Sequence, residues 1–218
     1  MIQLYHVCKK YDSSGFVLND INLLIKQGEW VVLKGREKTG KSTLIKLLCG
    51  IEKPTRGEMI ICGQNLSCIK KEKIFLYRRQ LGIIPDDINL LNDRSLYANI
   101  DLVFRFYGFS SRIREARIYE VLSLVGLEKK MDVISSKLSE FEKRKLVIAR
   151  ALVNSPRVIL ADDIDRGLDV SEAEEIYQIF KKLRTQDRVI LFSTREERCF
   201  LRGLREVELT SSGRISEN

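Results

Sequence analysis

Eight residues near the N-terminus have the composition and spacing of a phosphate-binding loop. The segment 35–42 has the sequence G-R-E-K-T-G-K-S, which fits the pattern G-x-x-x-x-G-K-[ST]. It lies where that pattern requires it, between the apolar run 30–34 and a helical periodicity that begins at Lys41. Glycines let backbone N–H groups close around phosphate oxygens, and the helix N-terminus adds partial positive charge.

The motif predicts a role for its polar side chains. We expect Lys41 to reach the β- and γ-phosphates, Ser42 to place its hydroxyl on Mg²⁺, and Thr43 to be the next phosphate contact. Asp162 directly follows the apolar run 158–161 and is predicted to hold the magnesium shell, because ligands of α/β proteins bind at the carboxyl ends of strands. The sequence therefore predicts a Mg²⁺–nucleotide site. The predicted phosphate-binding residues are Gly35, Lys38, Thr39, Gly40, Lys41, Ser42 and Thr43.

Short apolar runs alternate with helical periodicities along most of the chain, which predicts an α/β core with a mainly parallel sheet. Strands are expected at 2–7, 16–26, 30–34, 59–62, 81–84, 158–161 and 188–192. Between about 95 and 154 the chain is helical, strongly charged and almost free of strand patterns, which indicates an inserted helical unit. A later helix is expected to begin with a capping box of Ser171 and Glu174, and Thr194 with Glu197 fits the same pattern.

The composition indicates one folded unit and leaves several partners open. At about 150 residues per domain, 218 residues suit one large domain or one domain with a subdomain. The 44% hydrophobic and 31% charged residues exclude intrinsic disorder, and a net charge of +8 is compatible with a nucleic acid, an anionic membrane or a nucleotide. Apolar runs are far shorter than the about 18 residues that span a bilayer. With no secretion pattern and five scattered cysteines, we expect a cytosolic protein with reduced thiols.

Nearly the whole chain resembles the ATP-binding cassette (ABC) family of ATPases. Besides the phosphate loop and Asp162, Tyr11 stands where such domains stack an aromatic ring on adenine. Leu138 and Ser139 resemble the start of the signature loop, which faces nucleotide across a dimer, and Leu168-Asp169 resembles the loop that crosses the dimer interface. The resemblance implies the cofactors ATP and Mg²⁺.

The resemblance also implies an architecture for the chain. It is that of a P-loop NTPase forming a single ABC nucleotide-binding domain over 1–218, with a parallel-sheet core and an N-terminal antiparallel β subdomain. The core, which is RecA-like, and the β subdomain would occupy 1–94 and 155–218. The inserted α-helical subdomain, which carries the signature loop, would occupy 95–154.

Three stretches are most similar to the FtsE subfamily of bacterial cell-division ATP-binding proteins: 46–54, 76–82 and 90–100. This similarity implies a homodimer that sandwiches two ATP molecules and docks on an FtsX-like integral membrane protein to regulate septal cell-wall hydrolases. The protein would then be cytoplasmic and peripheral on the inner face of the cell membrane. Lipoprotein-release and macrolide-export cassettes share parts of these stretches, so a hydrolysis-competent ATPase subunit of such a transporter is the alternative.

Three polar positions depart from the family's catalytic pattern. Asp163 stands in place of the catalytic glutamate and is one methylene shorter, so its carboxylate retreats by about 1.5 Å from the water it must polarise. Arg195 stands where the family has a switch histidine. Asp86 replaces the glutamine of the Q-loop; it can still bind Mg²⁺, but when ionised it cannot donate a hydrogen bond.

The signature loop departs as well, because Glu140 and Phe141 replace two glycines that let a partner's backbone approach the γ-phosphate. Glu140 would bring a negative charge toward that phosphate, whereas Lys38, in place of a P-loop glycine, adds a positive one. The departures predict ATP binding with weak or no hydrolysis. The opposing hypothesis is slow turnover with Arg195 as an arginine finger and Asp163 as the base.

Basic residues are concentrated in and near the helical region: Arg78, Arg79, Arg105, Arg112, Arg114, Arg117, Lys143, Arg144 and Lys145. They predict a platform for an acidic segment of the membrane partner and for anionic lipid headgroups. Solvated helix faces are the alternative interpretation. Nucleic-acid binding is disfavoured, because the sequence has no helix-turn-helix or zinc module and no aromatic residues interleaved with the basic ones.

Overall fold

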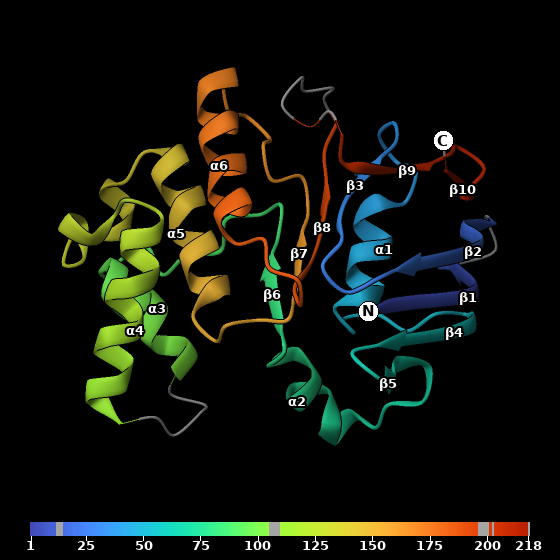
Figure 1. Ribbon diagram of the computed structural model, residues 1–218, viewed down its shortest axis with the longest axis horizontal. Coiled ribbons are helices and arrows are strands. Elements are labelled where there is room, and N and C mark those ends of the chain that lie inside the picture. The colour runs from blue at the N-terminus through green and yellow to red at the C-terminus, as the bar shows by residue number, and fades with distance from the viewer. Residues whose placement is uncertain (12–14, 105–109, 196–200, 202, 218) are drawn as a thin grey trace.

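Two β-sheets and two groups of helices make up the computed structural model, which describes residues 1–11, 15–104, 110–195, 201 and 203–217 (Figure 1). The larger sheet has the strand order β10-β9-β3-β8-β7-β6. Its strands are β3 (Trp30–Lys34), β6 (Leu81–Ile84), β7 (Val158–Ala161), β8 (Val189–Ser193), β9 (Arg205–Leu209) and β10 (Ile215–Glu217). All neighbours pair in parallel except β10, which is antiparallel to β9. The predicted α/β core with a mainly parallel sheet is therefore confirmed.

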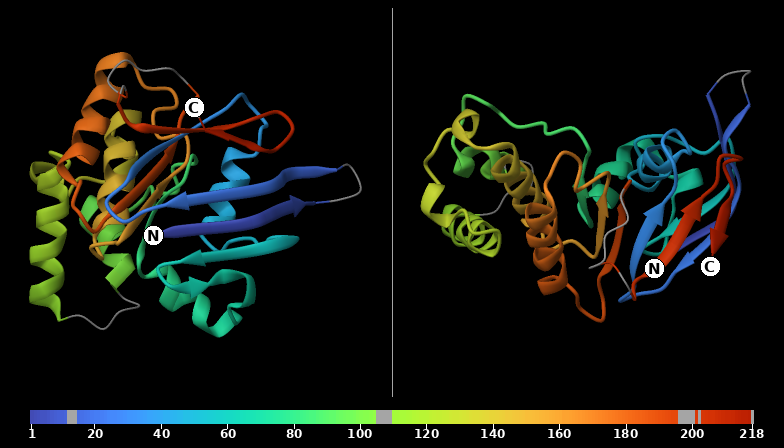
Figure 2. Two further views of the ribbon diagram at one scale, coloured as in Figure 1. Left: turned by 45° about the vertical axis from the view of Figure 1, so that its right-hand side comes forward. Right: turned by 90° about the horizontal axis from the view of Figure 1, so that it is seen from above.

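The smaller sheet is antiparallel and is built from the N-terminal part of the chain, as expected (Figure 2). Its order is β2-β1-β4-β5, with strands β1 (Ile2–Lys10), β2 (Phe16–Ile25), β4 (Arg56–Ile61) and β5 (Gln64–Asn65). Two 3₁₀ turns, η1 (Leu66–Cys68) and η2 (Lys71–Lys73), and the short helix α2 (Ile74–Arg78) then lead to β6.

Helices cover both faces of the larger sheet. Helix α1 (Lys41–Leu48) lies between the two sheets, while α5 (Glu140–Leu152) and α6 (Val170–Lys182) lie on the opposite face (Figure 1). Every residue of β7 and β8 is buried. A parallel strand covered on both faces needs apolar side chains on both, which is why these strands are nearly continuous apolar runs.

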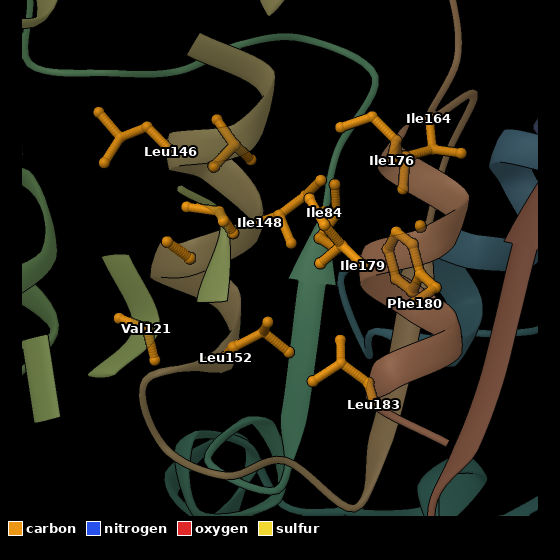
Figure 3. Close-up of a cluster of buried hydrophobic side chains, with 14 of the residues drawn as sticks. Ile84, Val121, Leu146, Ile148, Leu152, Ile164, Ile176, Ile179, Phe180 and Leu183 are labelled. Carbon is orange, nitrogen blue, oxygen red and sulfur yellow. The ribbon is translucent and has the colours of Figure 1, made fainter. Parts of the chain in front are cut away.

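The insertion packs on the sheet through α5. Ile148 and Leu152 of α5 meet Ile84 of β6 in a buried apolar cluster that includes Ile179 and Phe180 of α6 (Figure 3). Helices α3 (Leu96–Phe104) and α4 (Ser111–Leu124) pack against α5 on its far side, and the turns η3 (Glu128–Lys130) and η4 (Ser135–Lys137) join α4 to α5. Ser139, which is predicted to lie in the signature loop, is thus the N-cap of a helix that packs on the core.

Helix α6 begins two residues earlier than predicted. The capping box is formed by Asp169 and Glu172: the Asp169 carboxylate accepts from the Glu172 N–H at 2.8 Å, and the Glu172 carboxylate accepts from the Asp169 N–H at 3.2 Å. The prediction of Ser171 with Glu174 was wrong, because two overlapping segments fit the same pattern and the earlier one closes the helix. Glu197 lies outside the described residues.

Two further expectations concern the membrane and the thiols. Among the helices of the described part of the chain, none combines the length and the apolar character that a bilayer crossing requires. Cys8, Cys49, Cys62 and Cys68 are free thiols. Cys199 lies outside the described residues.

Gly82 fixes the approach of α5 to the sheet and provides a test of it. A Cβ atom at Gly82 would lie 2.9 Å from the Ala151 carbonyl oxygen and 2.9 Å from Cγ of Pro156. We expect Gly82→Ala to lower the free energy of unfolding by about 1–3 kcal/mol through overpacking, measured by urea denaturation. A Gly82→Ala variant as stable as the parent would contradict this close approach.

Candidate functional site

A cavity of about 340 Å³ lies at the carboxyl ends of β3, β7 and β8. Its lining residues come from the predicted phosphate loop, from the ends of β7 and β8, and from β2: Val17, Glu37, Lys38, Gly40, Lys41, Ser42, Thr43, Asp162, Asp163, Ser193 and Arg195. The fold therefore brings together segments that are more than 100 residues apart in the sequence. Most of the predicted phosphate-binding residues, Asp162 and both candidate catalytic residues share this cavity.

The loop from Gly35 to Gly40 has a backbone that glycine permits. Gly35 and Gly40 have φ of 145° and 100°, and a Cβ at Gly35 would lie 2.5 Å from the Leu209 carbonyl oxygen. Gly40 is the N-cap of α1, and no side chain caps the helix. The first N–H groups of α1 thus have no side-chain acceptor at the cap, which is the arrangement that binds anions.

Lys38 and Lys41 place two cations on the cavity wall. Lys38 is exposed and adopts a left-handed φ of 62°, although it is not a glycine. The Lys41 ammonium donates to the carbonyl oxygens of Gly35 and Arg36, the latter at 2.9 Å. Burial lowers the pKa of Lys41, and the nearby Asp163 carboxylate opposes that shift. Thr39 is buried and donates to the Arg36 carbonyl at 2.9 Å, so it braces the loop from inside.

A buried serine organises the two aspartates that follow β7. The Ser193 hydroxyl donates to Oδ1 of Asp162 at 2.7 Å and accepts from the Asp163 N–H at 2.8 Å. Ser193 is the last residue of β8 and is fully buried. The neighbouring strands β7 and β8 are therefore joined by a hydroxyl at the end where Asp162 faces the phosphate loop.

Arg195 joins the carboxylate of Asp163 to the phosphate loop. Its Nε pairs with Oδ2 of Asp163, and its Nη1 pairs with Oε1 of Glu37. Asp163 is 4% exposed and has a left-handed φ of 48°, a conformation that aspartate tolerates better than most residues. Burial raises the pKa of Asp163, and the Arg195 guanidinium opposes the rise. The carboxylate at the family's catalytic position is thus already engaged by a cation.

Asp86 is not brought to the cavity. Its Oδ2 pairs with Nη1 of Arg166 at 2.5 Å, and its carbonyl oxygen accepts from the buried Arg144 guanidinium at 2.9 Å. The loop after β6 is therefore tied to the loop after β7 by two arginines. A role of Asp86 as a Mg²⁺ ligand remains a prediction: Arg166 holds Oδ2, whereas Oδ1 is buried and has no hydrogen-bond partner among the described residues.

Ser139 caps α5 and lies outside the cavity lining. Its hydroxyl accepts from the Glu142 N–H at 3.2 Å, the Glu142 carboxylate accepts from the Ser139 N–H, and Glu140 pairs with Lys143 at 2.6 Å. The first turn of α5 thus carries two carboxylates of its own, which occupy the positive end of the helix. A contact of Ser139 with a nucleotide requires a second protein copy and remains a prediction.

Tyr11 lies beside the start of α1 rather than in the cavity wall. Its hydroxyl is 3.4 Å from Oγ1 of Thr43, its side chain is exposed, and the Lys9 ammonium lies 4.8 Å from the ring centroid. The ring is near the phosphate loop, and its stacking on adenine remains a prediction.

Many of the basic residues have partners within the chain. Arg117 donates to the carbonyls of Leu152 and Val153 at the end of α5, a position where a cation stabilises a helix. Arg114 pairs with Asp101 at 3.0 Å, Lys145 pairs with Glu175 at 2.7 Å, and Arg78 donates to Cys49 and Gly50. Helix stabilisation and intramolecular pairing therefore explain much of this charge. Arg105 lies outside the described residues.

Two functional positions were missed by sequence reasoning. Glu37 is one of the variable positions of the loop motif, which says nothing of its charge. Ser193 is a polar residue at the end of an apolar strand, and this was the available signal.

The described residues contain no cluster of three or more histidine, cysteine or acidic side chains that could hold a metal ion. Ser42 and Asp162 fit Mg²⁺ that arrives with phosphates, since this ion commonly takes one or two protein groups and substrate oxygens.

The glycine loop and uncapped helix α1 after β3, with Asp162 at the end of β7, a parallel strand separated from β3 by β8 alone, define a P-loop nucleotide-binding fold. A family model described as ABC transporter matches residues 18–165, which is more than half of the chain. The chain belongs to the ABC transporter family.

Curated relatives carry two different names. The chain is 38% identical over 183 residues to the methionine import ATP-binding protein MetN of Legionella pneumophila (strain Paris), covering 84% of this chain and 53% of that protein. It is 34% identical over 194 residues to the cell division ATP-binding protein FtsE of Streptococcus pneumoniae (serotype 2, strain D39), covering 89% and 84%. The chain thus spans about half the length of the MetN relatives. The similar identities support the family and do not separate the two roles.

A solved structure supports the fold over the full chain. The dimeric ATP-binding cassette MJ0796 in a post-hydrolysis state, bound to ADP and Pi, matches with a TM-score of 0.89 and 29% identity, covering 100% of this chain and 98% of that one. The expected ABC cassette fold is confirmed.

The Ser193 hydroxyl allows a direct test of how the two aspartates are held. We expect Ser193→Ala to lower the free energy of unfolding by about 1–3 kcal/mol, because it leaves the buried Asp163 N–H without its acceptor. Urea denaturation measures the change. Ser212→Ala removes an exposed hydroxyl that contacts Thr210 and should shift stability by less than about 0.5 kcal/mol. Equal effects of the two substitutions would contradict the assigned role.

Proposed function

We propose that this chain is the nucleotide-binding subunit of a membrane ABC complex, which binds Mg²⁺–ATP and hydrolyses it slowly or not at all without its partner. In this proposal 1–94 and 155–218 form the core with the β subdomain, and 95–154 form the helical subdomain. The observation that carries the proposal is that one cavity combines intact nucleotide-binding residues with an altered catalytic position. The phosphate loop and Asp162 are intact, whereas Asp163 is paired with Arg195.

Binding is supported by the loop. Backbone N–H groups, Lys38 and Lys41 would hold the phosphates, and Ser42 with Asp162 would hold Mg²⁺, which neutralises phosphate charge when bound. Tyr11 would lie beside the adenine ring. The Thr39 hydroxyl donates to the Arg36 carbonyl and so stabilises the conformation of the loop.

Slow hydrolysis is supported by three features outside the loop. The Arg195 guanidinium favours the charged form of Asp163, which makes this carboxylate a weaker base than it would be in the same buried position without the arginine, although burial raises its pKa. Asp86 is engaged by Arg166 and lies away from the cavity lining. In a dimer that pairs the cavity with a partner's α5, Glu140 and Glu142 would face the terminal phosphate with negative charge.

A membrane partner is supported by exposed apolar side chains next to α2. Ile51, Phe75 and Leu76 are 57%, 55% and 46% exposed. Ile51 also lines a cavity of about 310 Å³ together with Ile74 of α2. An FtsX-like integral membrane protein fits the FtsE relatives, and anionic headgroups would add contacts through exposed cations such as Arg112. The chain would act as an ATP-dependent homodimer on the cytoplasmic face of the membrane, in cell division.

The second candidate function is a hydrolysis-competent subunit of another ABC transporter, of the lipoprotein-release or macrolide-export type. In it, Arg195 would act as an arginine finger and Asp163 as the base. The MetN relatives, which are named for methionine import, likewise favour a transporter.

Retention of labelled ATP tests the proposal. Excess protein is incubated with labelled ATP and Mg²⁺, and the bound nucleotide is identified over hours. We expect the bound nucleotide to remain ATP; bound ADP within minutes would favour the second candidate. Lys41→Ala should weaken the affinity for ATP at least about tenfold, because it removes a charged group that donates hydrogen bonds to the phosphates. Lys46→Ala, an exposed lysine on the same helix, is the matched control. Binding that survives unchanged in Lys41→Ala would contradict the site.

A further inference from the structure

Cations and carboxylates are equal in number among the residues that line the phosphate cavity. The lining residues include three cations, Lys38, Lys41 and Arg195, and three carboxylates, Glu37, Asp162 and Asp163. Asp162 has a role at Mg²⁺ in the proposed function, and Asp163 stands at the family's catalytic position. Glu37 has neither role, and it lies on the phosphate loop itself, where a negative charge opposes phosphate binding.

The position of Glu37 relative to Arg195 explains why a carboxylate lies there. Glu37 is exposed, with a side-chain exposure of 68%, and Oε1 accepts from Nη1 of Arg195. The Nε of the same guanidinium pairs with Asp163 at the end of β7. Arg195 therefore forms ion pairs with carboxylates from two segments of the cavity lining, and Lys41 and Asp162 belong to the same lining.

Phosphate and Glu37 compete for one guanidinium. Arginine binds phosphate and carboxylate through the same fork of N–H donors, so the Nη1 edge that Glu37 occupies is an edge that a phosphate can take. The end of the cavity near Lys41 and Asp162 is where the terminal phosphate of a nucleoside triphosphate lies, because that lysine reaches the β- and γ-phosphates. A diphosphate lacks the group that reaches this end.

We propose that Glu37 is a positioning residue that pairs with Nη1 of Arg195, so that a terminal phosphate competes with the Glu37 carboxylate for this guanidinium, and that this exchange of partners sets how strongly the site prefers ATP over ADP. The inference rests on the proposed nucleotide binding and adds a determinant of selectivity to it. The ion pair between Asp163 and Nε of Arg195 stays in place during the exchange.

Affinities for two nucleotides, measured in four forms of the full chain, test the inference. A non-hydrolysable ATP analogue and ADP, each with Mg²⁺, are titrated into the parent, Glu37→Gln, Arg195→Gln and the double variant by calorimetry. We expect Glu37→Gln to bind the ATP analogue about two- to fivefold more tightly, because the competing exposed ion pair is removed. The affinity for ADP should change less, so the ATP-to-ADP ratio rises. In the Arg195→Gln background the same substitution should raise the ratio by a smaller factor.

A matched control separates this effect from the loss of any exposed carboxylate. Glu120 has 66% side-chain exposure, pairs with Nη1 of Arg117 at 2.5 Å on α4, and does not line the phosphate cavity. Glu120→Gln should leave both affinities and their ratio unchanged.

Each other outcome overturns the proposal in a recognisable way. If the parent binds nucleotide and Glu37→Gln leaves the ratio unchanged, or raises it equally without Arg195, Glu37 does not act through Arg195 and the proposed function stands. If neither the parent nor Glu37→Gln binds nucleotide, the proposed function is itself wrong, and the exchange falls with it.

Discussion

The pairing of the buried Asp163 carboxylate with the Arg195 guanidinium is the interaction on which the rest of the site depends. Burial of the Asp163 carboxylate, which is 4% exposed, disfavours its charged form, and a cationic partner beside it offsets part of that cost. Arg195 supplies that partner from the residues that follow β8, and Ser193 holds the backbone of Asp163 from the same strand. The second edge of the guanidinium then reaches the phosphate loop through Glu37. One cation thereby links three segments of the chain.

This arrangement makes the departures from the family pattern consistent with one another. The arginine at the switch position, Arg195, pairs with the buried carboxylate of Asp163. The glutamate in the phosphate loop, Glu37, pairs with another nitrogen of the same guanidinium. Outside the cavity, Asp86 places a carboxylate in the loop after β6 and the first turn of α5 carries Glu140 and Glu142, so both add negative charge where the family pattern has uncharged residues. In the proposed function, the loop backbone and Lys41 would bind the phosphates and Asp162 would hold Mg²⁺, whereas Asp163 stands at the position of the base. Arg195 lies between these two groups of residues, because it pairs with Asp163 and with Glu37 of the loop.

The sequence predicted the elements better than the contacts between their ends. Alternating apolar runs located the parallel strands, because β7 and β8 are buried on both faces and their side chains are nearly all apolar. The glycine-rich motif located the loop, because its backbone geometry demands glycine at Gly35 and Gly40. The start of α6 was missed by two residues, because Asp169 and Ser171 both satisfy a capping rule that is purely local.

The charged contacts of the site could not be predicted in this way. Glu37 and Arg195 are 158 positions apart, and no periodicity relates them. The same is true of Asp86, a predicted metal ligand, and Arg166, with which it pairs outside the cavity lining. Basic residues counted as a surface platform proved to include helix-end donors such as Arg117, whose acceptors are backbone carbonyls that a sequence does not display.

Single-turnover hydrolysis by the parent and by Asp163→Asn tests the central claim most directly. Protein is kept in excess over labelled ATP with saturating Mg²⁺, so that every ATP is bound and the rate reports chemistry alone. If Asp163 is neutralised by Arg195 and does not act as the base, both proteins should convert ATP slowly, at rates within about threefold of each other. A fall of about 10²-fold or more in Asp163→Asn is the loss expected from removing a general base, and it would contradict the account.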